Sequence, residues 1–90
     1  MNEYKLLLSQ TMERKLRKLE RRNRVAFEAI GKKALEIIAD PYRFKPLRAP
    51  LFGKRRVHID SNFVLVYSID EPGRSVCLLD YDHHDRIYQK

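Results

Sequence analysis

The sequence predicts an α+β domain in which an antiparallel sheet carries a helical hairpin on one face. Segments with helical periodicity fill the first half of the chain, and segments with strand character fill the second half. This order is typical of α+β folds rather than of alternating α/β folds. The chain has 90 residues, of which 43% are hydrophobic, which is enough for one core and therefore for a single domain over residues 1–90.

The first half of the chain predicts a strand followed by a helix. Residues 4–8 form an apolar run of strand length. Ser9 or Thr11 can then cap a helix, since a side-chain oxygen at that point accepts from a free amide of the first turn. The apolar stripe of this helix recurs at helical spacing, and it consists of Met12, Leu16 and Leu19.

A second helix is predicted to follow directly, with Asn23 as its cap. Asp40 and Pro41 end it, because proline cannot donate to the helix and restricts the residue before it. Its buried face has helical spacing and consists of Phe27, Ile30, Ala34 and Ile37 or Ile38. The two helices therefore form a hairpin that packs on the sheet.

The second half predicts four strands. Two short ones lie near residues 43–48 and 55–60, and two stronger ones cover residues 62–70 and 75–82. The stretch "EPGR" (71–74) places proline and glycine at the centre of a turn, which favours a type II turn. A short helix or tail ends the chain. Without counting the short strand near residues 43–48, the predicted order of elements is β-α-α-β-β-β.

The charge of the chain is large and unevenly distributed. The net charge is +7, and residues 1–56 carry +10 while residues 57–90 carry −3. Seven Lys and Arg residues crowd positions 14–24 with a single acid among them. A cationic half of this strength indicates a polyanionic partner, which is nucleic acid, an acidic protein or an anionic membrane.

The sequence offers no membrane span and no disulfide framework. No apolar run approaches the roughly 20 residues that cross a bilayer, and "MNEYKLLLSQ" lacks the basic start of a signal peptide. We therefore expect a cytoplasmic protein that does not enter a membrane. The single cysteine, Cys77, is expected to be a buried thiol.

The stretch "DYDHHDRIYQK" (80–90) concentrates candidate chemical groups. Asp80, Asp82, His83, His84 and Asp85 offer metal-ligating atoms. The adjacent histidines are expected to diverge, and no second cluster supplies further ligands. We therefore expect neither a metal nor another cofactor.

Metal-free cleavage of RNA suits the same residues better. RNA supplies its own nucleophile, the 2′-hydroxyl, so an enzyme needs only proton transfer and charge stabilisation. His58 and His84 suit the proton transfers, the bases from Lys45 to Arg56 suit the phosphate, and Tyr88 can stack on a base. Spacing along the chain does not bring these groups together.

The stretch "KPLRAPLFGKRRVHIDSNFVLVYSID" followed by "DHHDRIY" resembles the RelE/ParE superfamily of toxins from type II toxin–antitoxin systems. Within it, "HIDSNFVLVY" (58–67) and "HDRIY" (84–88) are most similar to YafQ-type mRNA interferases. The resemblance implies a ribosome-dependent endoribonuclease that cleaves mRNA and inhibits translation. It also implies a cognate antitoxin, which we expect to be acidic and to form a hetero-oligomer with the toxin.

The resemblance also assigns roles to individual residues. His84 falls on the principal catalytic histidine, His58 on a second functional histidine, and Tyr88 on the aromatic residue of the tail. Lys45 stands where YafQ-type toxins have another histidine. The residues expected to bind RNA or its phosphates are Arg48, Lys54, Arg55, Arg56 and Asn62.

Three positions depart from the family pattern. Asn62 stands where the family often has an aspartate, Arg56 where another acid can lie, and Val64 where RelE-type toxins have a phosphate-binding arginine. Two other functions therefore stay open. One is a ParE-like protein that poisons a DNA topoisomerase, and the other is a non-catalytic or decayed member that only binds nucleic acid.

Overall fold

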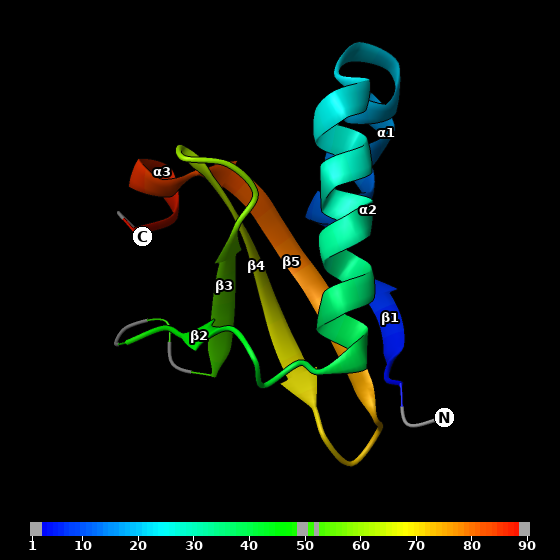
Figure 1. Cartoon of the computed structure of the whole chain (residues 1–90), viewed down its shortest axis with the longest axis vertical. Helices are drawn as coiled ribbons and strands as arrows, with labels where there is room; N and C mark the ends of the chain where they lie inside the picture. Colours follow the sequence, from blue (N-terminus) through cyan, green and yellow to red (C-terminus); the bar gives the residue numbers. More distant parts are fainter. Residues whose placement is uncertain (1–2, 49–50, 52, 89–90) are drawn as a thin grey trace.

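The computed structural model describes residues 3–48, 51 and 53–88, and it confirms the α+β class (Figure 1). The elements follow the predicted order, with a short third helix at the end of the chain. They are β1 (Lys5–Leu8), α1 (Gln10–Arg22), α2 (Arg24–Ala39), β2 (Lys45–Pro46), β3 (Lys54–His58), β4 (Phe63–Asp70), β5 (Ser75–His83) and α3 (His84–Tyr88). Among the described residues, no helix is both long and apolar enough to span a bilayer.

The five strands form one sheet in the order β1-β5-β4-β3-β2. The strands β2, β3, β4 and β5 pair antiparallel, as predicted. β1 differs, because it runs parallel to β5, with Leu6 opposite Val76 and Leu8 opposite Leu78. The sheet is therefore mixed rather than antiparallel throughout. Alternation of side chains has the same period in both kinds of pairing, so the sequence pattern carries no signal for the direction of this strand.

The helical hairpin begins and ends where its capping residues predict. The Ser9 hydroxyl accepts from the amide of Met12 at 3.0 Å, and the Asn23 side chain accepts from the amide of Ala26 at 3.1 Å. Each cap satisfies an amide that has no partner within its helix. α2 ends at Ala39, immediately before the predicted Asp40–Pro41 break.

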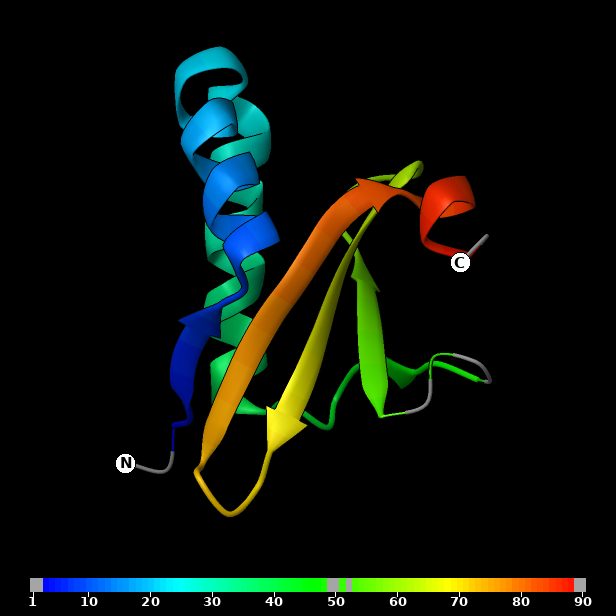
Figure 2. The same cartoon turned by 180° about the vertical axis from the view of Figure 1, so that it is seen from behind.

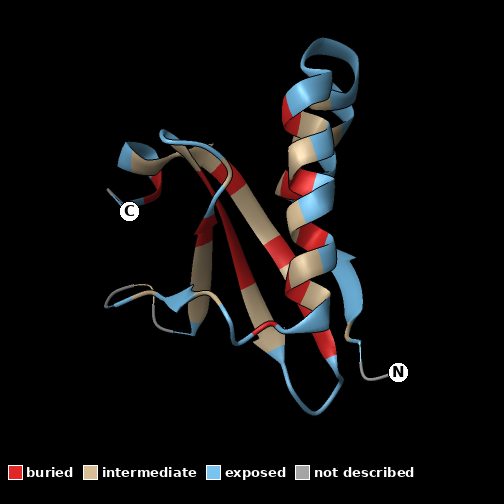
Figure 3. Ribbon diagram, viewed as in Figure 1, coloured by how far each residue is buried: buried red, intermediate tan, exposed pale blue. Residues whose placement is uncertain are grey.

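Buried residues occur in the helices α1 and α2 and along the strands β3, β4 and β5 (Figure 3), and they form two cores. The larger core lies between the sheet and the hairpin of α1 and α2, which stands over the β1 and β5 side of the sheet in both views (Figure 2). It is built from Met12, Ala26, Ile30, Ala34, Ile37, Val57, Leu65, Tyr67, Val76, Leu78 and Tyr81. A smaller core joins Val64, Val66 and Ile87 on the opposite face, where α3 packs. Cys77 is only half-buried and belongs to neither cluster, so the expectation of a core thiol is wrong.

The turn between β4 and β5 is not of type II. That type needs a positive φ at its second central residue, which would be Gly73, whereas the positive φ of 51° belongs to Arg74. A Cβ added at Gly73 would lie 2.5 Å from Oδ2 of Asp70, so any other residue there would have to displace the end of that flexible side chain.

Candidate active site

The face of the sheet opposite α1 and α2 collects most of the predicted site residues. Residues that pair across neighbouring strands point to the same face, and Val66 is buried on the α3 side. Lys45 pairs with Arg56, Arg56 with Val66, and Val66 with Asp80. These registers place Lys45 and Arg56 on that face, which we call the open face. His58 lies beside them, since it pairs with the equally buried Val64.

Four of the predicted residues line one hollow of about 330 Å³ on the open face. They are Lys45, Arg48, Arg56 and Tyr88. The Arg56 guanidinium lies 5.9 Å from the centroid of the Tyr88 ring, within the range of a cation–π contact. Residues from β2, β3 and α3 thus meet in a cationic hollow with one aromatic wall.

Arg56 also contacts His58, because its Nη1 atom lies 3.0 Å from Nδ1 of the imidazole. A guanidinium only donates hydrogen bonds, so Nδ1 of His58 accepts and the neutral ring carries its proton on Nε2. In this arrangement His58 presents an Nε2–H donor. Uptake of a second proton at Nδ1 requires that Arg56 first move away.

The start of α3 is fixed by the turn that joins β3 to β4. Asp60 accepts from the amides of Asn62 and Phe63, each at 2.8 Å, and these two hydrogen bonds lower the pKa of the Asp60 carboxyl below its ordinary value. The carbonyl of Asn62 in turn accepts from the amide of His84 at 2.9 Å. Asn62 therefore holds the backbone of His84 from the neighbouring turn, and its own side chain is exposed.

The expectation that His83 and His84 diverge is wrong. Their ring centroids are 4.6 Å apart with 30° between the planes, because β5 ends at His83 and α3 begins at His84, where the direction of the side chains changes. Both Nδ1 atoms approach the Asp85 carboxylate, at 3.7 Å from His83 and 3.0 Å from His84. Among the described residues, this trio is the group that could hold a metal ion, with ligand atoms within 4.8 Å of one another.

Arg55 does not join the other predicted phosphate ligands. It shares the helix-facing side of β3 with the buried Val57, and it donates to the carbonyls of Phe44 at 2.6 Å and Tyr42 at 3.3 Å. Its role in the structure is to hold the segment before β2. Lys54, one residue earlier, lies on the open face and lines a small hollow with Asp80 and Ile87.

Val64 is completely buried in the small core beneath α3. The position that the resemblance assigns to a phosphate-binding arginine is therefore a packing position here. The positive charge of the open face comes instead from Lys45, Arg48, Lys54 and Arg56.

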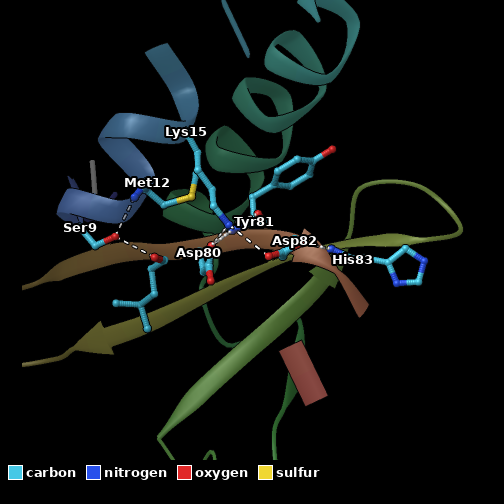
Figure 4. A network of polar contacts seen from close by, with 8 residues as sticks. Ser9, Met12, Lys15, Asp80, Tyr81, Asp82 and His83 are labelled. Carbon is cyan, nitrogen blue, oxygen red and sulfur yellow. Dashed lines mark hydrogen bonds and ion pairs between the residues drawn. The ribbon is translucent and has the colours of Figure 1, made fainter. Parts of the chain in front are cut away.

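Lys15 of α1 is a residue near the site that the sequence did not predict. Its Nζ atom donates to Oδ1 of Asp80 at 2.7 Å, to the carbonyl of Tyr81 at 2.9 Å and to Oδ2 of Asp82 at 3.3 Å. The two aspartates, which the sequence offers as possible metal ligands, thus bind a lysine (Figure 4). The other bases of α1 make such a lysine hard to recognise, and only the Asp-x-Asp spacing hints at a cationic partner.

The outer side of α1 forms a second cationic surface. Arg14, Arg17, Lys18, Arg21 and Arg22 line a shallow hollow of about 360 Å³; we call this the basic face of α1. Arg17 has an ion pair at 3.9 Å with Glu13, a weak interaction for two exposed side chains. The basic face therefore remains strongly positive.

Comparisons with known proteins agree on the family. The family described as "ParE toxin of type II toxin-antitoxin system, parDE" matches residues 6–88. An uncharacterized protein of Methanosarcina mazei is 51% identical over 85 residues, which cover 94% of this chain and 99% of that protein. A putative toxin RelE4 of Methanocaldococcus jannaschii is 42% identical over 87 residues, covering 97% of this chain and 93% of that protein.

Solved structures show the same fold. The toxin–antitoxin complex RelBE2 from Mycobacterium tuberculosis contains a chain that is 29% identical, with a TM-score of 0.76 over 90% of this chain and 98% of that one. YafQ from E. coli has a TM-score of 0.68 at 11% identity, over 96% of this chain and 99% of that one, so the likeness to YafQ extends to the fold but not to overall sequence. The chain belongs to the ParE toxin family of type II toxin–antitoxin systems, within the RelE/ParE superfamily.

Proposed function

We propose that the protein is a ribosome-dependent endoribonuclease that cleaves mRNA by attack of the RNA 2′-hydroxyl and thereby inhibits translation. The observation that carries this proposal is the open face, which gathers Arg56, His58, Lys45 and Tyr88 beside the tail that begins at His84. These groups supply proton transfer, phosphate binding and base stacking, which are the functions that this reaction needs.

In the proposed reaction the 2′-oxygen attacks phosphorus, the bond to the 5′-oxygen breaks, and a 2′,3′-cyclic phosphate forms. The 2′-hydroxyl loses its proton to a base, and the leaving 5′-oxygen receives one from an acid. We assign one of these transfers to His84, which is partly exposed at the start of α3. Because Arg56 occupies Nδ1 of His58, that histidine first serves as an Nε2–H donor to the phosphate.

Positive charge on the open face supports the developing charge of the transition state. Arg56 and Lys45 pair across β2 and β3, so both cations reach the same hollow. Arg48 and Lys54 extend the positive surface along the RNA backbone. Tyr88, with 45% of its surface exposed, provides a ring for stacking against a splayed base.

Two macromolecular partners follow from this proposal. The basic face of α1 suits ribosomal RNA, whose phosphates attract clustered Arg and Lys residues. The same charge suits an acidic antitoxin segment that folds on binding. The RelBE2 chain, 29% identical to this protein, was solved as a toxin–antitoxin complex, which supports a cognate antitoxin for this protein too.

The test compares wild type with His84→Ala, His58→Ala and His83→Ala after induced expression. We expect wild type and His83→Ala to arrest growth, and His84→Ala and His58→Ala not to. Loss of the acid–base group at His84 costs about 10²–10⁴ in rate, and loss of the His58 donor to the phosphate costs about 10²–10³. Cleaved transcripts should end in a 2′,3′-cyclic phosphate or a 3′-phosphate. Circular dichroism of each purified variant excludes unfolding as the cause. Full toxicity of folded His84→Ala would contradict the catalytic role of the tail.

Metal dependence is tested on the same protein. We expect toxin that has been treated with EDTA and then dialysed to cleave mRNA on intact ribosomes as fast as untreated toxin does. The chelator must be removed before ribosomes are added, because they need Mg²⁺ themselves. A loss of cleavage that Zn²⁺ restores would instead give the His83, His84 and Asp85 trio a role in the reaction.

A second candidate is inhibition of a DNA topoisomerase without RNA cleavage. The match to the ParE family and the buried Val64 at an arginine position of RelE-type toxins favour it. DNA supercoiling by a purified type II topoisomerase distinguishes the two functions. Inhibition of supercoiling by wild type and by His84→Ala alike would support this second candidate.

A further inference from the structure

β5 continues past the end of its neighbour, and the start of α1 takes over the exposed edge. β1 ends at Leu8, whereas β5 runs on to His83. The Ser9 amide donates to the carbonyl of Leu78 at 3.0 Å, and its hydroxyl donates to the carbonyl of Leu79 at 2.7 Å. Lys15 then donates to the carbonyl of Tyr81 at 2.9 Å. The helix and its cap thus replace the missing strand up to the last residues before the tail (Figure 4).

A β-bulge brings the two aspartates to the same ammonium group. Val66 pairs with Asp80, and the next residue, Tyr67, pairs with Leu78, so Leu79 is an extra residue in β5. Bulges of this kind bend a strand and redirect its side chains, and they are frequent next to active sites. Here the bulge precedes Asp80 and Asp82, which flank Tyr81 and reach Lys15 at 2.7 Å and 3.3 Å.

The contacts continue from Lys15 into the backbone of the tail. Oδ2 of Asp82 accepts from Lys15, and its Oδ1 accepts from the amide of His83 at 2.7 Å. Partial burial acts to raise the pKa of the Asp82 carboxyl, but the hydrogen bond from the His83 amide and the charge of Lys15 together lower it. Asp82 therefore stays ionised at neutral pH, one hydrogen bond from His83 and two residues from His84.

This group is more enclosed than an ordinary surface ion pair. The side chains of Lys15, Asp80 and Asp82 are 30%, 18% and 23% exposed. An ammonium group has three donors, and three acceptors on one strand receive them. Without Lys15, two carboxylates two residues apart would repel each other, and the last part of β5 would lose its tie to α1.

We propose that Lys15 is a positioning residue, which sets the place of the tail and hence of His84. The proposal rests on the proposed function, because it gives His84 a reaction to perform. Lys15 does not contact RNA at the site in this role; it acts through Asp82 and the backbone of His83. Displacement of a reacting group by about 1 Å can cost about 10²-fold in rate, which is the size of effect that this role implies.

The test uses Lys15→Met in the full chain, with Lys32→Met as the matched control. Lys32 is exposed on α2 and lies in neither of the two cationic surfaces, so the control removes the same charge from the other helix. Amide hydrogen exchange should become at least tenfold faster at His83 and His84 in Lys15→Met and stay unchanged in Lys32→Met. Unchanged exchange in folded Lys15→Met would overturn the proposal, whatever reaction the protein performs.

Kinetics separate positioning from simple stabilisation. On programmed ribosomes, we expect Lys15→Met to lower kcat by about 10–100-fold with little change in KM, and Lys15→Arg to recover part of the loss. A faster-exchanging tail with an unchanged kcat would overturn the positioning role. If wild type itself cleaves nothing, the proposed function fails, and the exchange measurement alone decides whether Lys15 holds the tail.

Asp82→Asn provides a second test of the same contacts, which still applies if Lys15→Met does not fold. It removes the charge that Lys15 meets while keeping the size of the side chain. We expect it to reproduce the faster exchange at His83, and we expect the double variant with Lys15→Met to add little, because residues in one network are not additive. Fully additive effects of the two substitutions would overturn the proposed chain of contacts from Lys15 to His83.

Discussion

Arg56 and His58 lie two residues apart on β3, and the Nη1 atom of the arginine is 3.0 Å from Nδ1 of the histidine. Their side chains point to the same face because residues two apart in a strand do so. The contact therefore fixes both the orientation of the imidazole and the nitrogen that carries its proton.

We predict that Arg56→Met lowers mRNA cleavage by about 10²–10³-fold, the usual cost of one donor to a developing oxyanion. Arg56→Lys should retain more activity, because lysine keeps the charge but lacks the planar fork of the guanidinium. Nitrogen NMR of the His58 ring should show the Nε2–H form in wild type and a mixture of both forms in Arg56→Met. An unchanged tautomer would mean that Arg56 does not control the ring.

The basic face of α1 should contribute to ribosome binding by neutralising RNA phosphates. Replacing Arg14, Arg17 and Arg21 by Gln should weaken this binding. The slope of log affinity against log salt should also become shallower, by about 0.7–0.9 for each phosphate that is no longer neutralised. Lys32→Gln serves as the control, since it changes the charge on α2. A salt slope that is the same in wild type and in the triple variant would exclude this surface from RNA binding.

Tyr67 should make the fold sensitive to alkaline pH. The side chain is fully buried, donates to the carbonyl of Pro41 at 2.6 Å, and has its pKa raised by burial from 10.0 to about 12. The unfolded chain loses this proton first, so the free energy of unfolding falls as pH rises from 10 to 12, by at most about 2.7 kcal/mol. Tyr67→Phe should be less stable than wild type at pH 8, and the difference should narrow at pH 11 in urea titrations. If the difference in unfolding free energy between wild type and Tyr67→Phe is the same at pH 8 and pH 11, the pKa of Tyr67 is not raised in the fold.

Glu71 should have the opposite dependence on pH. Its carboxylate accepts from Tyr42 at 2.6 Å, from Tyr4 at 2.9 Å and from Arg74 at 3.1 Å, and these hydrogen bonds, with that of Tyr42 first, lower its pKa below 4.5. A lowered pKa stabilises the fold above the unfolded value, and this stability is lost as pH falls through the folded one. Glu71→Gln should therefore be less stable than wild type at pH 7 but similar near pH 3. Glu28→Gln, which removes an exposed helix pair with Arg24, should change stability little at either pH.

The elements of the fold were predictable because each has its own local signal. Ser9 and Asn23 mark the helix starts, and Asp40–Pro41 marks the end of α2. The direction of β1 was not predictable, since it depends on where the helical hairpin returns the chain. The turn type was missed because the positive φ falls on Arg74 rather than on Gly73, and an arginine gives no signal for such a backbone angle.

The candidate site was predictable in its residue types and only partly in its geometry. The sequence could have predicted that Arg55 points away from the open face, because strand alternation places it on the same side as the buried Val57. The close approach of the His83 and His84 rings was not predictable, because it arises where a strand passes directly into a helix. The interaction of Lys15 with Asp80 spans 65 residues, and a single sequence carries no signal for it.

The parallel pairing of β1 with β5 has a consequence for the order in which the elements fold. Lys5 to Leu8 must wait for Ser75 to Leu78, so β1 finds its place only after the more distant β5 has been made. The α1–α2 hairpin is held by local interactions and can form early, whereas distant pairings form slowly. Until then Leu6, Leu7 and Leu8, which remain partly exposed even in the finished fold, have no neighbouring strand. The β1 edge of the sheet is thus closed late in folding, after β4 and β5 have paired.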